Sequence, residues 1–181
     1  MPLIFQYGSN CDAGRLNGEK RLAGDANDLG RAETVDEHDI CFDVWSQGNG
    51  CAAADLLLAP GSGRHAWGVL YQISDTALAK LRQIEGKYYE ERRIIVRNEA
   101  GEEVEASTFL VKMDARRQGL WTSVDYVGHI VKGLREHEIA EEYVQHVIDI
   151  AIETNRKALG RAHDDAVAME KLRNSEKGQK R

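Results

Sequence analysis

The sequence predicts a single folded domain that combines β-strands with α-helices. A length of 181 residues favours one domain with a sizeable core. Short apolar stretches, several of them alternating with polar residues, recur up to Lys112 and are typical of β-strands. Apolar residues at helical spacing follow Ser74 and Ser123. No internal repeat or proline-rich linker divides the chain.

The strand predictions rest on apolar runs bounded by turn-forming residues. The run from Cys51 to Ala59 is almost continuously small and apolar, which suits a strand buried on both faces. Asn98-Glu99-Ala100-Gly101 is typical of a turn between two strands. The predicted strands are residues 3–7, 41–45, 51–59, 66–73, 92–96 and 104–112.

The helix predictions rest on caps and on periodicity. Ser74 and Asp75 are good cap residues, and Gly86 stands where a left-handed helix stop is expected. Residues 18–37 are polar and rich in Gly and Asp, so we expect a surface loop or an irregular helix there. The predicted helices are residues 75–85, a segment starting near Ser123, residues 138–154 and a short helix over residues 10–17.

Composition excludes several classes of partner. The net charge of −6 argues against a general binder of nucleic acid or of anionic membranes. No apolar run could span a bilayer, and the N-terminus has no basic region typical of a signal peptide. Three widely spaced cysteines, with no metal-binding pair, fit a reducing cytoplasm. We therefore expect a cytoplasmic protein without a metal site, a nucleic-acid partner or a membrane partner.

The domain is expected to cover residues 1–158. Residues 159–181 are then a polar C-terminal extension, either helical or frayed. Its last part, residues 171–181, is basic and carries no aromatic residues among its charges, which favours a solvated end over a site for an anionic partner.

The first functional motif is Tyr7-Gly8-Ser9-Asn10, where an apolar run ends. A buried strand that breaks at a glycine opens into a loop at the start of a helix, and Ser9 or Asn10 can cap that helix. Free backbone N–H groups at such a junction suit either a carboxylate or a developing oxyanion, and the sequence leaves the two open.

The second functional feature is a carboxylate on the apolar side of a predicted helix. Successive residues step by about 100° around a helix, so Glu85 projects between Leu81 and Leu78. A carboxylate there is partly desolvated, which raises its pKa and suits general acid–base work near neutral pH. The alternative is that Glu85, at the helix end, swings outward into solvent.

Taken together, these segments resemble the γ-glutamylcyclotransferase family. The resemblance rests on Tyr7-Gly8-Ser9-Asn10, on the strand Ala66-Trp67-Gly68-Val69-Leu70-Tyr71 and on Leu81-x-x-x-Glu85-Gly86, in that order. It spans roughly residues 3–150. It implies a compact mixed α+β domain with a small antiparallel, barrel-like sheet flanked by helices.

The resemblance also implies an activity and a site. The activity is cofactor-free cleavage of a small-molecule γ-glutamyl amide, in which the substrate's own α-amine attacks and 5-oxoproline is released with an amine or amino acid. Glu85 is implied as the general acid and base. The residues implied in substrate binding are Ile4, Phe5, Gln6, Tyr7, Gly8, Ser9 and Tyr126.

Other functions stay open at this stage. The fold could serve as a non-catalytic binding module, a reading favoured if Glu85 faces solvent or if no cavity joins it to residues 4–9. It could instead remove a γ-glutamyl group from a biosynthetic intermediate, and the chain could form a homodimer. Asn10 makes glutathione a less favoured sole substrate. Cys11 lies near a helix start, but scattered histidines form no triad with it, so a structural role is expected.

Overall fold

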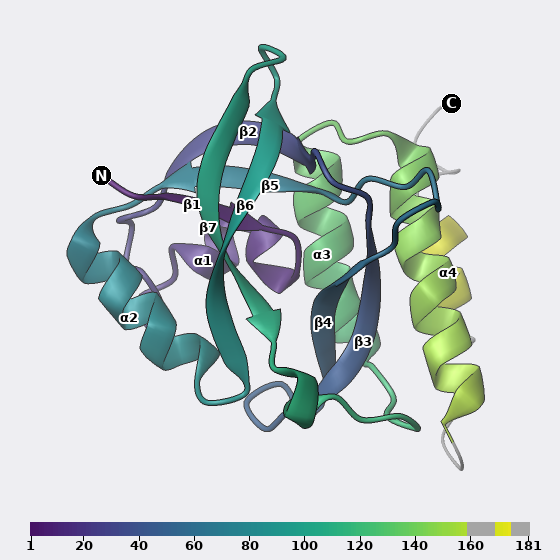
Figure 1. Cartoon of the computed structure of the whole chain (residues 1–181). Helices are drawn as coiled ribbons and strands as arrows, with labels where there is room; N and C mark the ends of the chain where they lie inside the picture. Colours follow the sequence, from purple (N-terminus) through teal and green to yellow (C-terminus); the bar gives the residue numbers. More distant parts are fainter. Residues whose placement is uncertain (159–168, 175–181) are drawn as a thin grey trace.

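Five strands close into a barrel in the computed structural model, which describes residues 1–158 and 169–174 (Figure 1). The order around the barrel is β1 (Leu3–Gln6), β5 (Trp67–Gln72), β2 (Asn27–Thr34), β6 (Tyr89–Asn98) and β7 (Glu103–Val111). Together with the helices around it, this barrel confirms the expected mixed α+β class. One detail differs, because β1 and β7 pair in parallel and close the barrel with Ile4 opposite Ser107. The other neighbours are antiparallel, as expected.

A two-stranded hairpin stands beside the barrel. It consists of β3 (His38–Ser46) and β4 (Cys51–Leu58), which pair antiparallel. Residues 51–56 of β4 are buried in succession, so the prediction of a strand covered on both faces is confirmed for most of its length. The burial arises because β4 packs against the barrel strand β7, and Tyr126 contacts its backbone at Ala54.

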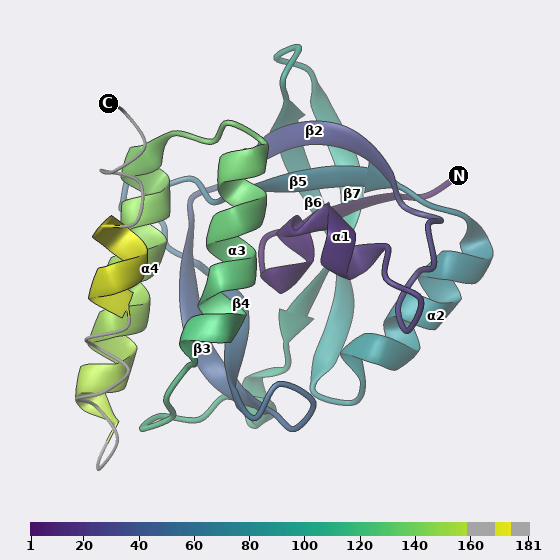
Figure 2. The same ribbon diagram turned by 180° about the vertical axis from the view of Figure 1, so that it is seen from behind.

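The long helices lie on opposite sides of the barrel. The two views agree that α3 (Val124–Glu136) and α4 (Glu141–Lys157) run side by side next to the hairpin, whereas α2 (Asp75–Glu85) lies at the far side (Figures 1 and 2). Shorter turns are η1 (Ser9–Cys11), α1 (Ala13–Leu16) and η2 (Met113–Ala115). Within the described residues, no helix combines the length and the apolar character needed to cross a membrane.

The predicted helix caps are present. Ser74 Oγ accepts the N–H of Ala77 at 3.0 Å and starts α2, and Ser123 Oγ accepts the N–H of Tyr126 at 3.2 Å and starts α3. Gly86 ends α2 at a φ of 71°. Its ψ of −162° makes the chain extended there rather than left-handed helical, a conformation that is essentially restricted to glycine.

The short helix predicted over residues 10–17 is wrong in its start. Residues 9–11 form the 3-10 turn η1, and the four-residue helix α1 begins only at Ala13. Neither Ser9 nor Asn10 caps it, because Asp12 accepts the N–H of Arg15 at 3.2 Å and is the N-cap. One 3-10 turn therefore precedes the helix, and the side chain of Asn10 makes other contacts.

The prediction of loop or irregular helix over residues 18–37 is wrong for its second half. Residues 27–34 form β2, although the segment is polar and its first three residues are exposed. It is a strand because β5 and β6 pair with it on either side, so tertiary hydrogen bonding overrides weak local propensity.

The C-terminal extension is described only in part. Residues 169–174 are helical, and Met169 is fully buried in the core, so this part of the extension is packed rather than frayed. The other predictions for the extension fall on residues 159–168 and 175–181, which lie outside the described residues.

Candidate functional site

A cavity of about 370 Å³ joins the loop after β1 to the end of α2. Its volume lies within the range of about 300–1,000 Å³ that is usual for small-molecule sites. The lining residues from the early loop are Gln6, Tyr7, Gly8, Ser9 and Asn10, and those from other elements include Glu85, Tyr89, Phe109 and Tyr126. The two sequence motifs, 75 residues apart, therefore meet at one cavity.

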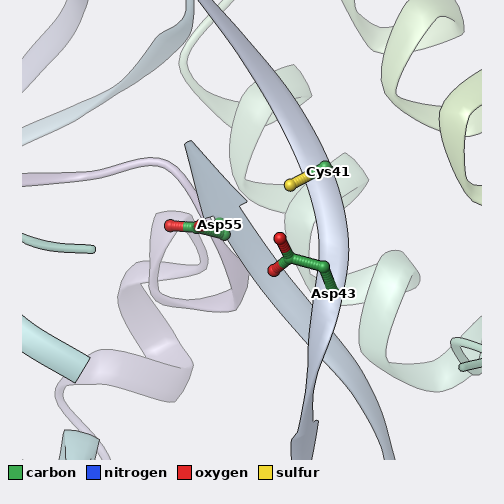
Figure 3. Close-up of side chains that lie close together, drawn as sticks. All are labelled: Cys41, Asp43 and Asp55. Atoms are coloured by element: carbon green, nitrogen blue, oxygen red, sulfur yellow. The ribbon is translucent and has the colours of Figure 1, made fainter. Parts of the chain in front are cut away.

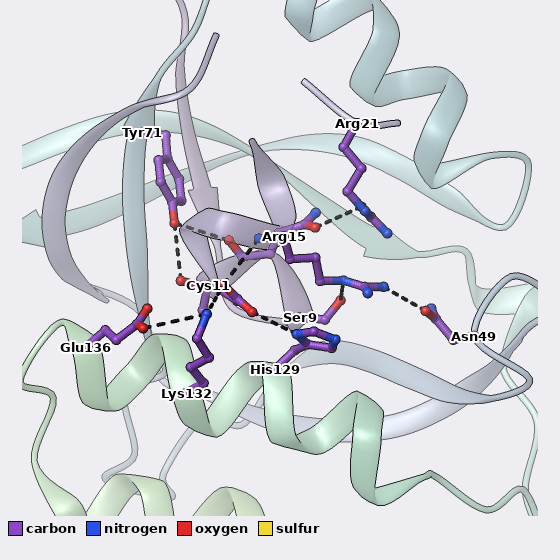
Figure 4. Close-up of polar contacts among 11 residues, drawn as sticks. Ser9, Cys11, Arg15, Arg21, Asn49, Tyr71, His129, Lys132 and Glu136 are labelled. Atoms are coloured by element: carbon purple, nitrogen blue, oxygen red, sulfur yellow. Dashed lines mark hydrogen bonds and ion pairs between the residues drawn. The ribbon is translucent and has the colours of Figure 1, made fainter. Parts of the chain in front are cut away.

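The early loop is held by a buried carboxylate. Asp12 accepts hydrogen bonds from His129 Nδ1 at 2.8 Å and from Lys132 Nζ at 2.7 Å, both on α3 (Figure 4). Burial alone would raise the pKa of Asp12, but these bonds and the N–H of Arg15 outweigh it and hold the pKa below its usual value. Asp12 thus stays ionised and ties the loop to α3.

Gly133 lets α3 approach this loop at backbone distance. A Cβ atom at Gly133 would lie 2.1 Å from the carbonyl carbon of Cys11 and 2.4 Å from the nitrogen of Asp12. No side chain fits between the helix and η1, so the loop rests directly on the helix backbone. The position of the cavity-lining residues of η1 therefore depends on a glycine some 125 residues later in the chain.

Glu85 is half-buried and points into the cavity rather than out into bulk solvent. Asn10 Nδ2 donates to its Oε1 at 3.1 Å. Burial raises the pKa of Glu85 above its usual value, while the charge of Arg21, the bond from Asn10 and the charge of Arg15 act in the opposite direction. This is the environment expected of a carboxylate that takes up and returns protons near neutral pH.

Two tyrosine hydroxyls form hydrogen bonds with the backbone of one residue of β4, Ala54. Tyr126 Oη accepts the N–H of Ala54 at 3.0 Å, and Tyr89 Oη donates to the carbonyl of Ala54 at 2.8 Å. Burial raises the pKa of Tyr126 to about 12, so this hydroxyl is neutral in the folded protein. This part of the cavity lining is thereby held by polar groups that carry no charge.

The other predicted site residues divide into two groups. Gln6, Tyr7, Gly8, Ser9 and Tyr126 line the cavity with Glu85. The side chains of Ile4 and Phe5 are fully buried in the barrel core and do not line it, so their part in binding stays a prediction. 

Cys11 has the structural role expected of it. The residue is fully buried, and its thiol donates to the carbonyl of Gln6 at 3.0 Å. Burial raises the pKa of Cys11 far above its usual value, which leaves no thiolate to act as a nucleophile.

Comparison with known proteins supports this fold. Residues 65–147 match the model of the AIG2-like family, a stretch that includes Glu85 and Tyr126 but not the early loop. A solved structure named gamma-glutamyl cyclotransferase matches 96% of this chain and 98% of its own, with a TM-score of 0.73 at 19% identity. The protein has a γ-glutamylcyclotransferase-like fold. The resemblance found in the sequence is thereby confirmed.

Two further solved structures share the γ-glutamylcyclotransferase-like fold. An uncharacterized protein from Homo sapiens matches 80% of this chain and 85% of its own, with a TM-score of 0.70 at 23% identity. A yeast gamma-glutamyl cyclotransferase specific to glutathione matches 84% and 98%, with a TM-score of 0.53 at 11% identity. No curated protein sequence matches the chain.

Sequence reasoning missed two cations at this cavity. Arg15 and Arg21 both line the cavity. Arg15 donates from Nε to Ser9 Oγ at 3.2 Å and from Nη2 to Asn49 Oδ1 at 2.7 Å, which connects the early loop to the β3–β4 turn (Figure 4). The end of β3 also contributes Ser46 to the lining. Arg15 lies in the predicted short helix and Arg21 in the predicted loop, and neither position marks a side chain that faces a cavity.

A second polar cluster lies on the β3–β4 hairpin of the γ-glutamylcyclotransferase-like fold. Ligand atoms of Cys41, Asp43 and Asp55 lie within 4.8 Å of one another (Figure 3). Arg116 pairs with both carboxylates, at 2.9 Å from Asp55 and 3.5 Å from Asp43. Asp55 also accepts the N–H of Val111 at 2.9 Å. We interpret the cluster as a structural bridge from the hairpin to β7 and the segment that follows it.

The buried carboxyl of this cluster should make stability depend on pH. Burial raises the pKa of Asp55 to about 6, above a usual value of about 3.9 in unfolded chains. The folded state therefore holds a proton that the unfolded state has lost, and this contribution disappears as the pH rises from about 4 to about 6.

The Asp55→Asn variant cannot lose that proton. Its free energy of unfolding, relative to wild type, should rise by up to about 3 kcal/mol between pH 4 and pH 7. Urea unfolding of both proteins across this range measures the difference. If the free energies of unfolding of the two proteins change with pH in parallel, Asp55 titrates like an exposed carboxyl.

Proposed function

We propose that the protein cleaves a γ-glutamyl amide by cyclisation of the glutamyl unit, releasing 5-oxoproline and an amine or amino acid. The observation that carries this proposal is the cavity that joins Glu85 to the loop of residues 6–9. The fold supports the cyclotransferase class, and the cavity supports the reaction: its described lining has one carboxylate, whose pKa burial raises, and no cysteine.

The substrate supplies its own nucleophile. Glu85 accepts a proton from the α-ammonium group, so that the amine nitrogen can attack the γ-carbonyl carbon. The five-membered ring closes, the C–N bond of the amide breaks, and the carboxylic acid of Glu85 protonates the leaving nitrogen. The attacking nitrogen starts with three protons and keeps one in 5-oxoproline, so it loses two. The leaving nitrogen gains two and departs as an ammonium ion, so the protons balance. Because ring closure is intramolecular, correct positioning supplies much of the acceleration.

The early loop offers donors for the negative charges of this reaction. In the described part of the chain, the backbone N–H groups of Gly8 and Ser9 have no hydrogen-bond acceptor. They can bind the substrate's α-carboxylate or the oxyanion that forms at the γ-carbonyl. Arg15 and Arg21 add positive charge to the same cavity, which favours a substrate that carries a carboxylate.

Gln6 adds a donor that the fold itself does not use. The side chain is only 7% exposed, and its Nε2 has no partner in the described residues. A buried N–H without an acceptor costs about 1–3 kcal/mol, so its retention at the cavity supports a role toward a bound acceptor group.

The proposal predicts release of 5-oxoproline from a panel of γ-glutamyl amino acids, γ-glutamyl amines, glutathione and larger γ-glutamylated amides. Mass spectrometry should detect 5-oxoproline and free amine in equal amounts. The control is the same substrate with an acetylated α-amine, which a cyclotransferase cannot cleave but a hydrolase can. Release of glutamate, or cleavage of the acetylated substrate, would contradict cyclisation. Saturable binding of 5-oxoproline without turnover of any substrate would favour the binding-module alternative.

A further inference from the structure

We propose that Arg21 is a positioning residue that acts through the Asn10 amide to hold the Glu85 carboxylate in place and ionised. The inference rests on the proposed function for its catalytic meaning. Arg21 Nη1 donates to Asn10 Oδ1 at 2.9 Å, and Asn10 Nδ2 donates to Glu85 Oε1 at 3.1 Å. The three side chains form a continuous chain of hydrogen bonds along one wall of the cavity.

The direction of every bond in this chain is fixed by chemistry. A guanidinium group only donates, so the oxygen of the Asn10 amide must face Arg21. The amide nitrogen must then face Glu85, and it also donates to Gln6 Oε1 at 3.2 Å. The Asn10 amide cannot flip without losing these contacts. This bond uses the oxygen of the Gln6 amide, whose nitrogen has no partner in the described part of the chain.

Arg21 has an unusual charge environment for a half-buried cation. Among residues 1–158 and 169–174, no carboxylate lies within ion-pairing distance of it, and its hydrogen bond goes to a neutral amide. Burial and the charge of Arg15 lower the pKa of Arg21, whereas the charge of Glu85 raises it. A desolvated cation is costly, and here the opposite charge that compensates it is Glu85, reached through Asn10.

The other charged and titratable groups around Glu85 do not share this connection. Arg15 is the second cation of the cavity, but its hydrogen bonds go to Ser9 and Asn49. Tyr7, Tyr89 and Tyr126 are neutral, because burial raises the pKa of each. Arg21 is therefore the cation, within the described part of the chain, that is coupled to Glu85 by both charge and hydrogen bonding.

The loop that carries Arg21 is closed on itself. Asn17 spans it, donating from Nδ2 to the carbonyl of Ala26 and accepting the N–H of Ala26, both at 2.9 Å. Leu22, the next residue after Arg21, is buried and its N–H donates to the carbonyl of Leu16 at 3.0 Å. None of these contacts involves the side chain of Arg21, so that side chain can be shortened without opening the loop.

The test measures the titration of Glu85 in the full chain, without substrate. Carbon-13 NMR of side-chain carboxyls reports the pH at which Glu85 ionises. The Glu85 signal is assigned from its loss in Glu85→Gln. In Arg21→Met the midpoint of the Glu85 titration should move to higher pH. In Arg21→Lys, which keeps the charge, the midpoint should stay close to that of wild type. The matched control Arg64→Met removes an exposed arginine outside the cavity and should leave the midpoint unchanged.

Activity gives the second measurement. If Glu85 must be ionised to accept a proton, activity is lost as the pH falls through its pKa, and a raised pKa moves this acidic limb upward. Relative to the variant's own alkaline plateau, Arg21→Met should lower kcat/KM about tenfold on the acidic side, the scale of one hydrogen bond to a charged group.

Asn10→Asp is the second variant, since it keeps the shape of the side chain and the contact with Arg21. It replaces the donor to Glu85 with a like charge, so the Glu85 midpoint should again move upward. An unmoved midpoint in both Arg21→Met and Asn10→Asp would overturn the inference. If wild type releases no 5-oxoproline, the proposed function fails, while the NMR titration still decides the coupling.

Discussion

Replacement of Glu85 by glutamine should lower kcat/KM for 5-oxoproline release by roughly 10³-fold, within the span of 10²–10⁴ typical of general acid–base catalysis. Glutamine keeps the size of the side chain and an oxygen that can accept the bond from Asn10. It cannot take a proton from the substrate ammonium group or return one to the leaving nitrogen. The substitution therefore removes the chemistry and leaves the cavity intact.

Stability separates this loss from a folding defect. Burial raises the pKa of Glu85, so its ionisation destabilises the folded state above the usual pKa of a glutamate. Glu85→Gln should be at least as stable as wild type at neutral pH, measured by urea unfolding. Glu105→Gln, an exposed glutamate on β7, is the matched control and should keep full activity. Activity of Glu85→Gln within tenfold of wild type would remove Glu85 from the mechanism.

The sequence was most informative where local rules and tertiary structure agree. The cap at Ser74, the apolar side of α2 and the stop at Gly86 placed Glu85 correctly, because all three act within one helix. The early motif was likewise placed at a strand end. What periodicity could not provide was their meeting in space, and the resemblance to a known family supplied that expectation.

The rest of the site depends on contacts between distant segments. Arg21 reaches the cavity because the bond pair between Asn17 and Ala26 closes a loop that has no periodic pattern. Similarly, β2 is a strand because β5 and β6 flank it, not because its own residues favour one. The sequence pattern of a single segment shows neither how a loop is closed nor which strands pair with it.

Gly133→Ala should destabilise the protein by about 3 kcal/mol, the upper end of the usual cost of overpacking. Helix propensity alone predicts the opposite sign, since alanine is favoured over glycine in a helix by about 1 kcal/mol. The added methyl group would lie 2.1 Å from the carbonyl carbon of Cys11 and 2.4 Å from the nitrogen of Asp12. Both are backbone atoms, so no change of rotamer relieves the contact, and η1 must move away from α3.

The displaced turn carries Ser9 and Asn10, so activity should fall together with stability. The matched control is Gly128→Ala on the same helix, where an added methyl group meets no atom within 4 Å. That variant should gain up to about 1 kcal/mol from propensity. Urea unfolding and 5-oxoproline release of both variants measure the contrast. If the two substitutions change stability in the same direction, the early loop is not held by direct contact with the backbone of α3, and the site does not depend on that glycine.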